Sequence, residues 1–190
     1  MDELGQLQSE ISGQKAGGLL GNIFLIGFMG SGKSTVSACL SEVFSIEAIE
    51  MDQLIAKREG KSIPDIFAQH GEAYFRGLET KLLDELSEKR GVVVSCGGGV
   101  PMREENVIKM KKNGLVVLLR ASPQTILERV RNSHDRPLLE GHKDVSYISG
   151  LMEQRREKYE AAADITVSAD GRTVREICTE LVKKILEMRI

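Results

Sequence analysis

Aromatic residues are scarce in this chain, and charge of neither sign dominates it. The chain has no tryptophan, and aromatic residues make up only 4% of its 190 positions. The 26 Lys and Arg residues are balanced by 28 Asp and Glu residues, which gives a formal net charge of -2. Proteins that hold nucleic acids depend on a basic field and on aromatic rings that stack bases. The composition therefore speaks against a nucleic-acid partner.

Cysteine and long apolar runs are scarce as well. Cys39, Cys96 and Cys178 form an odd set at wide spacings, which is typical neither of a disulfide framework nor of a zinc site. The longest apolar stretch, residues 19–29, is interrupted by two glycines and an asparagine and is shorter than the ~20 residues of a membrane span. Acidic rather than basic residues precede it, unlike a signal peptide. We expect a cytoplasmic protein without a membrane contact.

Short apolar runs alternate with helical patterns from residue 22 to residue 190, which predicts a single domain. Because the runs are continuous and do not alternate with polar residues, they suit strands that are covered on both faces. The predicted fold is α/β, with a mostly parallel five-stranded sheet flanked by helices. The expected strands are 23–26, 46–49, 92–94, 115–119 and 165–167.

Two further segments differ from this pattern. Residues 1–21 are rich in Gly, Gln and Ser without a sustained period, and we expect them to form a disordered N-terminal tail. Residues 132–143 combine charges with Pro137 and Gly141, and we expect a long exposed loop that acts as a lid.

Three helices carry clear signals. Leucines four residues apart, at 78, 82 and 86, predict one buried stripe on a helix over 75–88. Ser122 followed by Pro123 is typical of an N-cap and first turn. Thr173 with Glu176 three residues later predicts a capping box at the start of the last helix.

One motif carries chemistry directly. Gly27, Gly32, Lys33 and Ser34 match the pattern G-x-x-x-x-G-K-[ST], and the match follows an apolar run and precedes a helical segment, as a phosphate-binding loop requires. The glycines let backbone N–H groups turn toward phosphate, Lys33 reaches the β and γ phosphates, and the Ser34 hydroxyl is a candidate ligand of Mg²⁺. A dinucleotide-binding fingerprint fails, because Thr35 stands where its third glycine belongs.

Other polar residues follow the expected strands, where parallel sheets bind ligands. Asp52 follows the second apolar run, with Glu50 two residues earlier, and three glycines at 97–99 follow the third run. Arg76 comes directly after Phe75, and a guanidinium beside an aromatic wall suits a carboxylate. Neither an Asn-Lys-x-Asp motif nor an acid at the end of the third or fourth expected strand is present, so transfer of phosphate to a small acceptor is favoured over a switch or motor protein.

Taken together, these segments resemble the shikimate kinase family. The resemblance covers about residues 22–190 and keeps the order and near-usual spacings of the family. The matching segments are GFMGSGKST from Gly27, EMD at 50–52, IF at 66–67, GEAYFRGLE from Gly71, GGG at 97–99, RPLL from Arg136 and RREKYEAAAD from Arg155.

The resemblance implies a P-loop kinase of the nucleoside-monophosphate-kinase type, which transfers the γ-phosphoryl group of ATP to the 3-hydroxyl of shikimate. Phe67 and Phe75 would then line the ring pocket, and Glu79 would brace Arg76. The residues that bind shikimate would be Asp52, Arg76, Gly98 and Arg155.

On the nucleotide side, the resemblance implies Mg²⁺ as cofactor, with Ser34 as its ligand. The catalytic residues would be Lys33, Asp52 and Arg136, the last of these reaching the phosphates from the lid. Arg129 falls where the family contacts adenine. The ATP-binding residues would be Gly30, Ser31, Gly32, Lys33, Ser34, Thr35, Arg136 and Arg172.

The chain departs from the family pattern at one position, because Glu50 stands where an Asp is common, which puts the role of this residue at the metal in doubt. Two alternatives stay open: a kinase for another small hydroxy acid such as gluconate, and a nucleotide-binding regulatory protein without turnover. We expect a monomer whose partners are small molecules.

Overall fold

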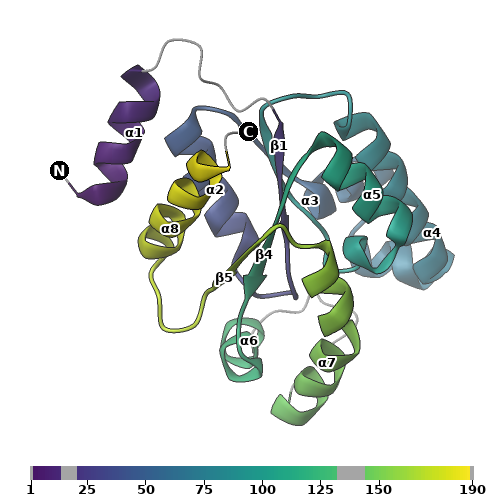
Figure 1. Cartoon of the computed structure of the whole chain (residues 1–190). Coiled ribbons are helices and arrows are strands. Elements are labelled where there is room, and N and C mark those ends of the chain that lie inside the picture. Colours follow the sequence, from purple (N-terminus) through teal and green to yellow (C-terminus); the bar gives the residue numbers. More distant parts are fainter. Residues whose placement is uncertain (1, 14–20, 132–143, 189–190) are drawn as a thin grey trace.

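The protein is built on a sheet of five parallel strands (Figure 1). The computed structural model describes residues 2–13, 21–131 and 144–188. The strands lie side by side in the order β2-β3-β1-β4-β5. This arrangement confirms the predicted parallel sheet. The strands are β1 (Asn22–Ile26), β2 (Glu47–Glu50), β3 (Val92–Ser95), β4 (Gly114–Arg120) and β5 (Ile165–Ser168).

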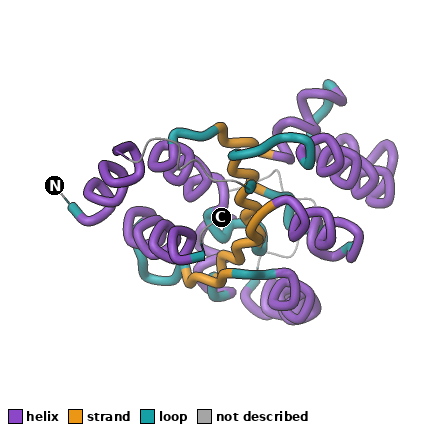
Figure 2. The backbone as a smooth tube through the Cα atoms, turned by 45° about the horizontal axis from the view of Figure 1, so that its top comes forward, coloured by secondary structure: helices purple, strands orange, loops and turns teal. Residues whose placement is uncertain are grey.

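Helices cover both faces of the sheet, as Figure 2 shows. Successive residues of β1 point to opposite faces, with Ile23 and Leu25 in one hydrophobic cluster and Phe24 and Ile26 in the other. The first cluster includes residues of α1 (Glu3–Gly13), α2 (Lys33–Phe44), α6 (Pro123–Val130) and α8 (Val174–Glu187). The second includes residues of α3 (Met51–Glu59), α4 (Ile63–Leu86) and α5 (Glu104–Asn113), while α7 (Val145–Ala162) contributes to both.

The helix signals in the sequence are confirmed at three places. The Ser122 side chain accepts a hydrogen bond from the backbone N–H of Thr125, and both bonds of the capping box between Thr173 and Glu176 are present. The predicted leucine stripe is buried at Leu82 and Leu86. Its helix is longer than predicted, because α4 already begins at Ile63.

α4 contains a kink at Gly71. The φ angle there is 79° and ψ is 172°, so the helix is interrupted and resumes at the next residue. Glycine adopts this conformation without the strain that a side chain would add. The kink divides α4 into two segments, and the second segment carries Arg76 and Glu79.

The prediction of a disordered tail over residues 1–21 is wrong for residues 3–13. They form α1, and Leu4 is only 6% exposed against the cluster that joins α2 and α8. Lys183 of α8 forms an ion pair with Glu3. A helix of this length is marginal in water, so its stability comes from docking that the local sequence does not reveal. The expected lid over 132–143 lies outside the described residues.

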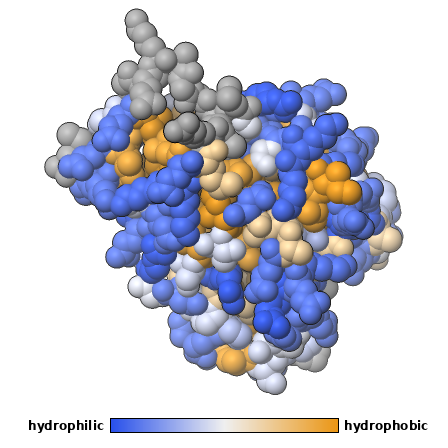
Figure 3. Space-filling model, viewed as in Figure 1, coloured by the Kyte–Doolittle hydropathy of each residue, from blue (hydrophilic) through white to orange (hydrophobic). Residues whose placement is uncertain are grey.

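The surface of the described residues is largely polar. Figure 3 shows a face that is mostly hydrophilic, with smaller hydrophobic areas between charged side chains. Among the described residues, no helix combines the length and apolar character needed to span a membrane.

The docking of α1 can be tested with Leu4→Ala. Removing this buried side chain should lower the free energy of unfolding by about 2 kcal/mol, near the low end for core leucines, because a terminal helix can shift to fill the space. Denaturant unfolding measures this loss. Ile108→Ala is the control, since Ile108 is 60% exposed and its loss should cost less than about 0.5 kcal/mol. Equal stability of Leu4→Ala and the unaltered chain would mean that α1 does not dock in solution.

Candidate active site

The loop between β1 and α2 turns through three glycines in backbone conformations that favour glycine. The φ angle is 146° at Gly27, 78° at Gly30 and 102° at Gly32. A Cβ atom at Gly27 would lie 2.5 Å from the backbone oxygen of Leu119, so the loop also packs tightly on β4. Glycine at this position therefore serves both the turn and the close approach.

The side chain of Lys33 lies back over this loop. Its Nζ donates hydrogen bonds to the backbone oxygens of Gly27 at 3.0 Å and of Phe28 at 3.1 Å. α2 begins at Lys33, and no side chain caps its first turn. The N–H groups of that turn and the positive end of the helix dipole can therefore bind an anion. The loop has the form that phosphate binding requires.

Oxygen ligands gather beside the loop. The Ser34 hydroxyl donates a hydrogen bond of 2.7 Å to the Glu50 carboxylate at the end of β2. Asp52, in the first turn of α3, lines the same cleft. Within the described ranges, no group of three or more His, Cys, Asp or Glu could hold a metal by itself. Mg²⁺ needs no such cage, because it binds through one or two protein oxygens together with water and phosphate, so this donor set fits it.

A cleft of about 520 Å³ opens at the carboxyl ends of the strands, next to the phosphate loop between β1 and α2. Phosphate-loop residues lie at one end of it, and the arginines that sequence analysis assigned to the acceptor lie elsewhere in the same cleft. Of the predicted site residues, the lining includes Gly30, Gly32, Lys33, Ser34, Thr35, Asp52, Arg76, Gly98 and Arg155. The fold thus brings together residues that are up to 125 positions apart in the sequence, from Gly30 to Arg155.

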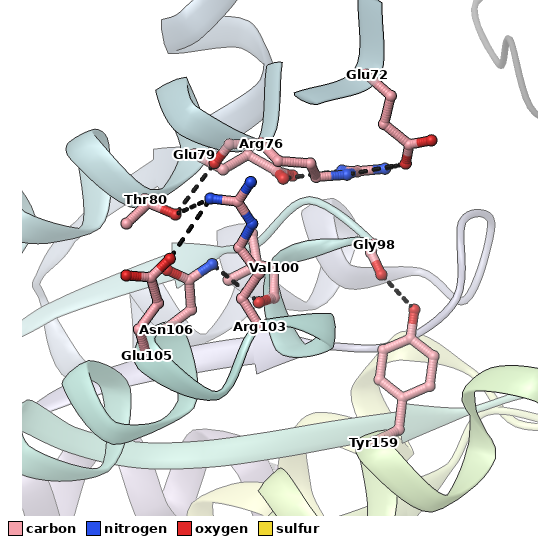
Figure 4. A network of polar contacts seen from close by, with 10 residues as sticks. All are labelled: Glu72, Arg76, Glu79, Thr80, Gly98, Val100, Arg103, Glu105, Asn106 and Tyr159. Atoms are coloured by element: carbon pink, nitrogen blue, oxygen red, sulfur yellow. Dashed lines mark hydrogen bonds and ion pairs between the residues drawn. The ribbon is translucent and has the colours of Figure 1, made fainter. Parts of the chain in front are cut away.

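Arg76 is held tightly in this cleft, with its side chain only 13% exposed. Its Nη1 donates to Glu79 Oε2 at 2.8 Å, as the predicted brace requires. Its guanidinium also lies 5.8 Å from the ring centroid of Phe67 and 5.5 Å from that of Phe75, within range of a cation–π contact. On its other side it bonds Glu72 (Figure 4). The aromatic wall predicted beside Arg76 is therefore present.

The glycines after β3 allow this packing. A Cβ atom at Gly97 would lie 2.3 Å from Glu79 Oε1, and one at Gly99 would lie 2.1 Å from Arg76 Nη1. Neither contact could be relieved by a small shift, because both atoms belong to a buried ion pair. The loop thus lies directly against the side chains of α4.

The carboxyl group of Glu79 is fully buried. Burial raises its pKa from the ordinary value of 4.5 to about 7, although the adjacent Arg76 guanidinium lowers it. The nearby Asp52 carboxylate raises it further. Glu79 is therefore a costly charge, which Arg76 alone among the residues that the structure describes compensates through a hydrogen bond.

The other arginine, Arg155, reaches the cleft from α7. Its guanidinium lies 5.8 Å from the centroid of the Phe28 ring. Its Nη1 is buried and has no hydrogen-bond partner among the described residues. A buried cationic donor left in this state is an obvious place for an anionic ligand.

Tyr159 lies one turn after Arg155 and was missed as a site residue by sequence analysis. Its hydroxyl donates a hydrogen bond of 2.6 Å to the backbone oxygen of Gly98. Tyr159 thus ties α7 to the glycine loop, the segment 97–99 that follows β3 (Figure 4). Burial raises the pKa of this hydroxyl, which keeps it protonated as a donor. The four-residue spacing from Arg155 was the available signal, because it places both residues on one helix face.

Four predicted nucleotide contacts are not among the residues that line the cleft. Arg136 is outside the described residues. Arg172 is outside the cleft lining and pairs with Glu180 at 2.6 Å, and Ser31 is a buried residue of the loop. Arg129 donates hydrogen bonds to the backbone oxygens of Gly30 and Ser31. Their roles toward ATP stay predictions.

Cys96 lines the cleft but is almost fully buried, and burial raises the pKa of its thiol. Its sulfur lies 3.9 Å from that of Met110. A protonated thiol in an apolar setting packs as a small hydrophobic side chain. Cys96 is therefore a packing residue of the cleft wall.

A glycine-rich phosphate loop on a parallel sheet, facing two arginines across one cleft, defines the class of P-loop kinases that act on small molecules. Comparison of the sequence with models of known families gives a match to "Shikimate kinase" over residues 29–186. The chain belongs to the shikimate kinase family. The resemblance found in the sequence is thereby confirmed.

Individual relatives agree with this assignment over more than nine tenths of their length. The shikimate kinase of Sulfurihydrogenibium sp. is 44% identical over 86% of this chain and 97% of the relative. The shikimate kinase of Aquifex aeolicus is also 44% identical, over 86% of this chain and 93% of the relative. A solved shikimate kinase from Acinetobacter baumannii, in complex with shikimate, has a TM-score of 0.88 at 32% identity and covers 93% of this chain and 98% of its own.

A gluconokinase from Sinorhizobium meliloti is similar in fold only. Its TM-score is 0.58 at 21% identity, over 90% of this chain and 94% of its own. The two kinds of kinase share the architecture, so the fold by itself does not choose between the acceptors considered from the sequence.

The raised pKa of Glu79 predicts a pH dependence of stability. Because its folded-state pKa lies above the ordinary value of 4.5, the folded state holds this proton more firmly than the unfolded state. The stabilisation is complete below about pH 4.5 and is lost as the pH rises to about 7, with a total on the order of 3 kcal/mol.

Urea unfolding between pH 4.5 and pH 7.5 measures this effect. Other groups also titrate, so the relevant quantity is the difference between the unaltered chain and Glu79→Gln, which should lose the downward slope. Glu85→Gln is the control, since Glu85 is on the same helix as Glu79 but is exposed, and it pairs with Arg58 of α3. A slope that persists in Glu79→Gln would show that Glu79 is not its source.

Proposed function

We propose that this protein transfers the γ-phosphoryl group of ATP to the 3-hydroxyl of shikimate. The observation that supports this most directly is the buried Nη1 of Arg155, which has no hydrogen-bond partner among the described residues and lies in the same cleft as Arg76 and Lys33. Two fixed guanidinium groups suit a small carboxylic acid, and the phosphate loop beside them suits a nucleoside triphosphate.

The acceptor acid binds at the arginine end of the cleft. Arg76 and Arg155 hold its carboxylate, and Phe67 and Phe75 lie against its ring. Gly98 contributes its backbone, which the bond to Tyr159 keeps in place. A cyclic acid uses both the charges and the aromatic wall, whereas a linear polyol acid would use the charges alone.

ATP binds at the other end, with its phosphates on the N–H groups of residues 30–35. Lys33 exchanges its bonds with the loop carbonyls for bonds with the β and γ phosphates. Two further arginines, Arg136 and Arg172, were predicted from the sequence to contact ATP. We assign them the remaining nucleotide contacts.

Ser34 would hold Mg²⁺, with the Glu50 and Asp52 carboxylates close enough to bind its water shell. When bound, this ion neutralises charge on the phosphates. The hydrogen bond between Ser34 and Glu50 keeps both oxygens at the cleft wall. Glu50 therefore serves in the place where the family commonly has aspartate.

Asp52 accepts a hydrogen bond from the 3-hydroxyl and takes its proton as the new bond from oxygen to phosphorus forms and ADP departs. Phosphoryl transfer asks little covalent chemistry of the protein, so alignment and charge neutralisation supply most of the rate. Lys33, Asp52 and Arg136 are the residues we assign to this step.

Release of ADP in the presence of single acceptors tests this function. Shikimate should support steady turnover, while gluconate and nucleoside monophosphates should support little, because the aromatic wall and paired arginines select a cyclic acid. Lys33→Ala should abolish most of the turnover while the chain remains folded, since Lys33 neutralises phosphate charge. Turnover with gluconate in preference to shikimate would favour the alternative kinase, and no turnover with any acceptor would favour a regulatory protein.

Neighbouring arginines on α7 provide a matched pair for the acceptor site. Arg155→Ala should raise the KM for shikimate roughly 10- to 150-fold and leave the KM for ATP near its original value, because a charge-assisted contact to the acid is lost. Arg156→Ala should change either KM less than about 2-fold, since Arg156 is 52% exposed and pairs with Glu153. Steady-state kinetics with each substrate varied in turn gives both values, and equal effects of the two substitutions would remove Arg155 from the site.

A further inference from the structure

The guanidinium of Arg76 presents two different edges to its neighbours. Its Nη1 donates to Glu79 Oε2 at 2.8 Å. Its Nε and Nη2 both donate to a single oxygen of Glu72, at 3.1 and 2.9 Å. The edge formed by Nε and Nη2 is one that arginine uses to bind a carboxylate with two parallel hydrogen bonds. In this structure a side chain of the protein itself occupies that edge (Figure 4).

The two carboxylates around Arg76 differ in their surroundings. The side chain of Glu79 is 1% exposed and lies under the glycine loop, so it is a fixed part of the fold. The side chain of Glu72 is 54% exposed. It can turn into solvent without leaving a buried charge behind, whereas Glu79 cannot. Only the Glu72 contact can be exchanged for a ligand at low cost.

Glu72 reaches Arg76 because the two residues are one helical turn apart on α4. The helix is interrupted at Gly71 and resumes at Glu72, one turn before Arg76, so the two side chains share a face of the second segment. A Cβ atom at Gly71 would meet nothing within 4 Å, and its φ of 79° is the reason for a glycine there. The helix thus places an exposed acid directly beside Arg76, which lines the cleft.

We propose that Glu72 is an internal substitute for the carboxylate of the acceptor, and that the acceptor displaces it from the Nε and Nη2 edge of Arg76. This inference rests on the proposed function, in which Arg76 binds that carboxylate. Before binding, Glu72 compensates a guanidinium whose side chain is only 13% exposed. On binding, it swings into solvent and the acid of the ligand takes its place.

This exchange makes Glu72 a specificity residue. A ligand with a carboxylate replaces one ion pair by another, so its net cost is small. A neutral ligand would have to break the Glu72 pair without replacing it, or bind without contacting Arg76. The acid gains an ion pair with Arg76 in exchange for the one that Glu72 loses. A neutral ligand loses the Glu72 pair and gains none, so the exchange selects against it.

If the acceptor displaces Glu72, removing the charge of Glu72 should improve the binding of shikimate, which few other roles of this residue would produce. In Glu72→Gln the KM for shikimate should fall about 2- to 5-fold, the range of a partly exposed ion pair, and the KM for ATP should not change. Glu85→Gln is the matched control, because it removes an exposed ion-paired glutamate from the same helix and lies outside the cleft lining. It should leave both KM values unchanged.

Two further measurements separate displacement from a general effect on the fold. The methyl ester of shikimate, which lacks the charge, should also bind more tightly after Glu72→Gln, because it no longer has to break an ion pair that it cannot replace. In an Arg76→Ala background, Glu72→Gln should have no effect on the KM for shikimate, because the edge that Glu72 occupies is gone.

The outcomes distinguish this inference from the function on which it rests. If Arg76→Ala leaves the KM for shikimate unchanged, Arg76 does not bind the acid and the proposed acceptor site fails with it. If Arg76→Ala raises that KM while Glu72→Gln raises it or leaves it unchanged, the acceptor site stands and Glu72 is a positioning residue for Arg76, which overturns the displacement. A gain for the acid without any gain for the ester would indicate charge repulsion by Glu72 and would overturn the displacement as well.

Discussion

The buried ion pair between Arg76 and Glu79 is the interaction on which the acceptor end of the cleft depends. Burying two charges is expensive, and the cost is recovered only when geometry is good and both partners are present. Here the pair lies one helical turn apart on a rigid segment of α4, 2.8 Å from each other, with glycines at 97 and 99 directly against it. A larger residue at either glycine would push the loop away from the pair.

Polar contacts around this pair join three elements into one wall. Tyr159 bonds the backbone of Gly98 from α7, and Asn106 bonds the backbone of Val100 from α5. Arg103 bonds the Thr80 hydroxyl, which in turn bonds the backbone oxygen of Arg76. None of these side chains belongs to the phosphate loop. Together their contacts, drawn in Figure 4, hold the loop after β3 against α4.

The two ends of the cleft are built by different physical means. At the phosphate end, backbone groups do most of the work, because glycine conformations and a helix terminus create the anion site. At the acceptor end, side chains with buried charges do it, and they need support from neighbouring elements. The first kind of site is local in sequence, whereas the second is assembled from α4, the loop after β3 and α7.

The sequence by itself determined the strands, the helix caps, the phosphate loop and the family, because each depends on residues that are close together or on motifs in a fixed order. The position of Arg76 beside an aromatic side chain could also be predicted from the sequence, since Phe75 directly precedes it. Only the tertiary structure decided that α1 docks, that Tyr159 holds Gly98 and that Glu72 lies on the edge of Arg76. These features depend on contacts between distant segments or between side chains one helical turn apart, and neither apolar periodicity nor local spacing reports the free energy of such contacts.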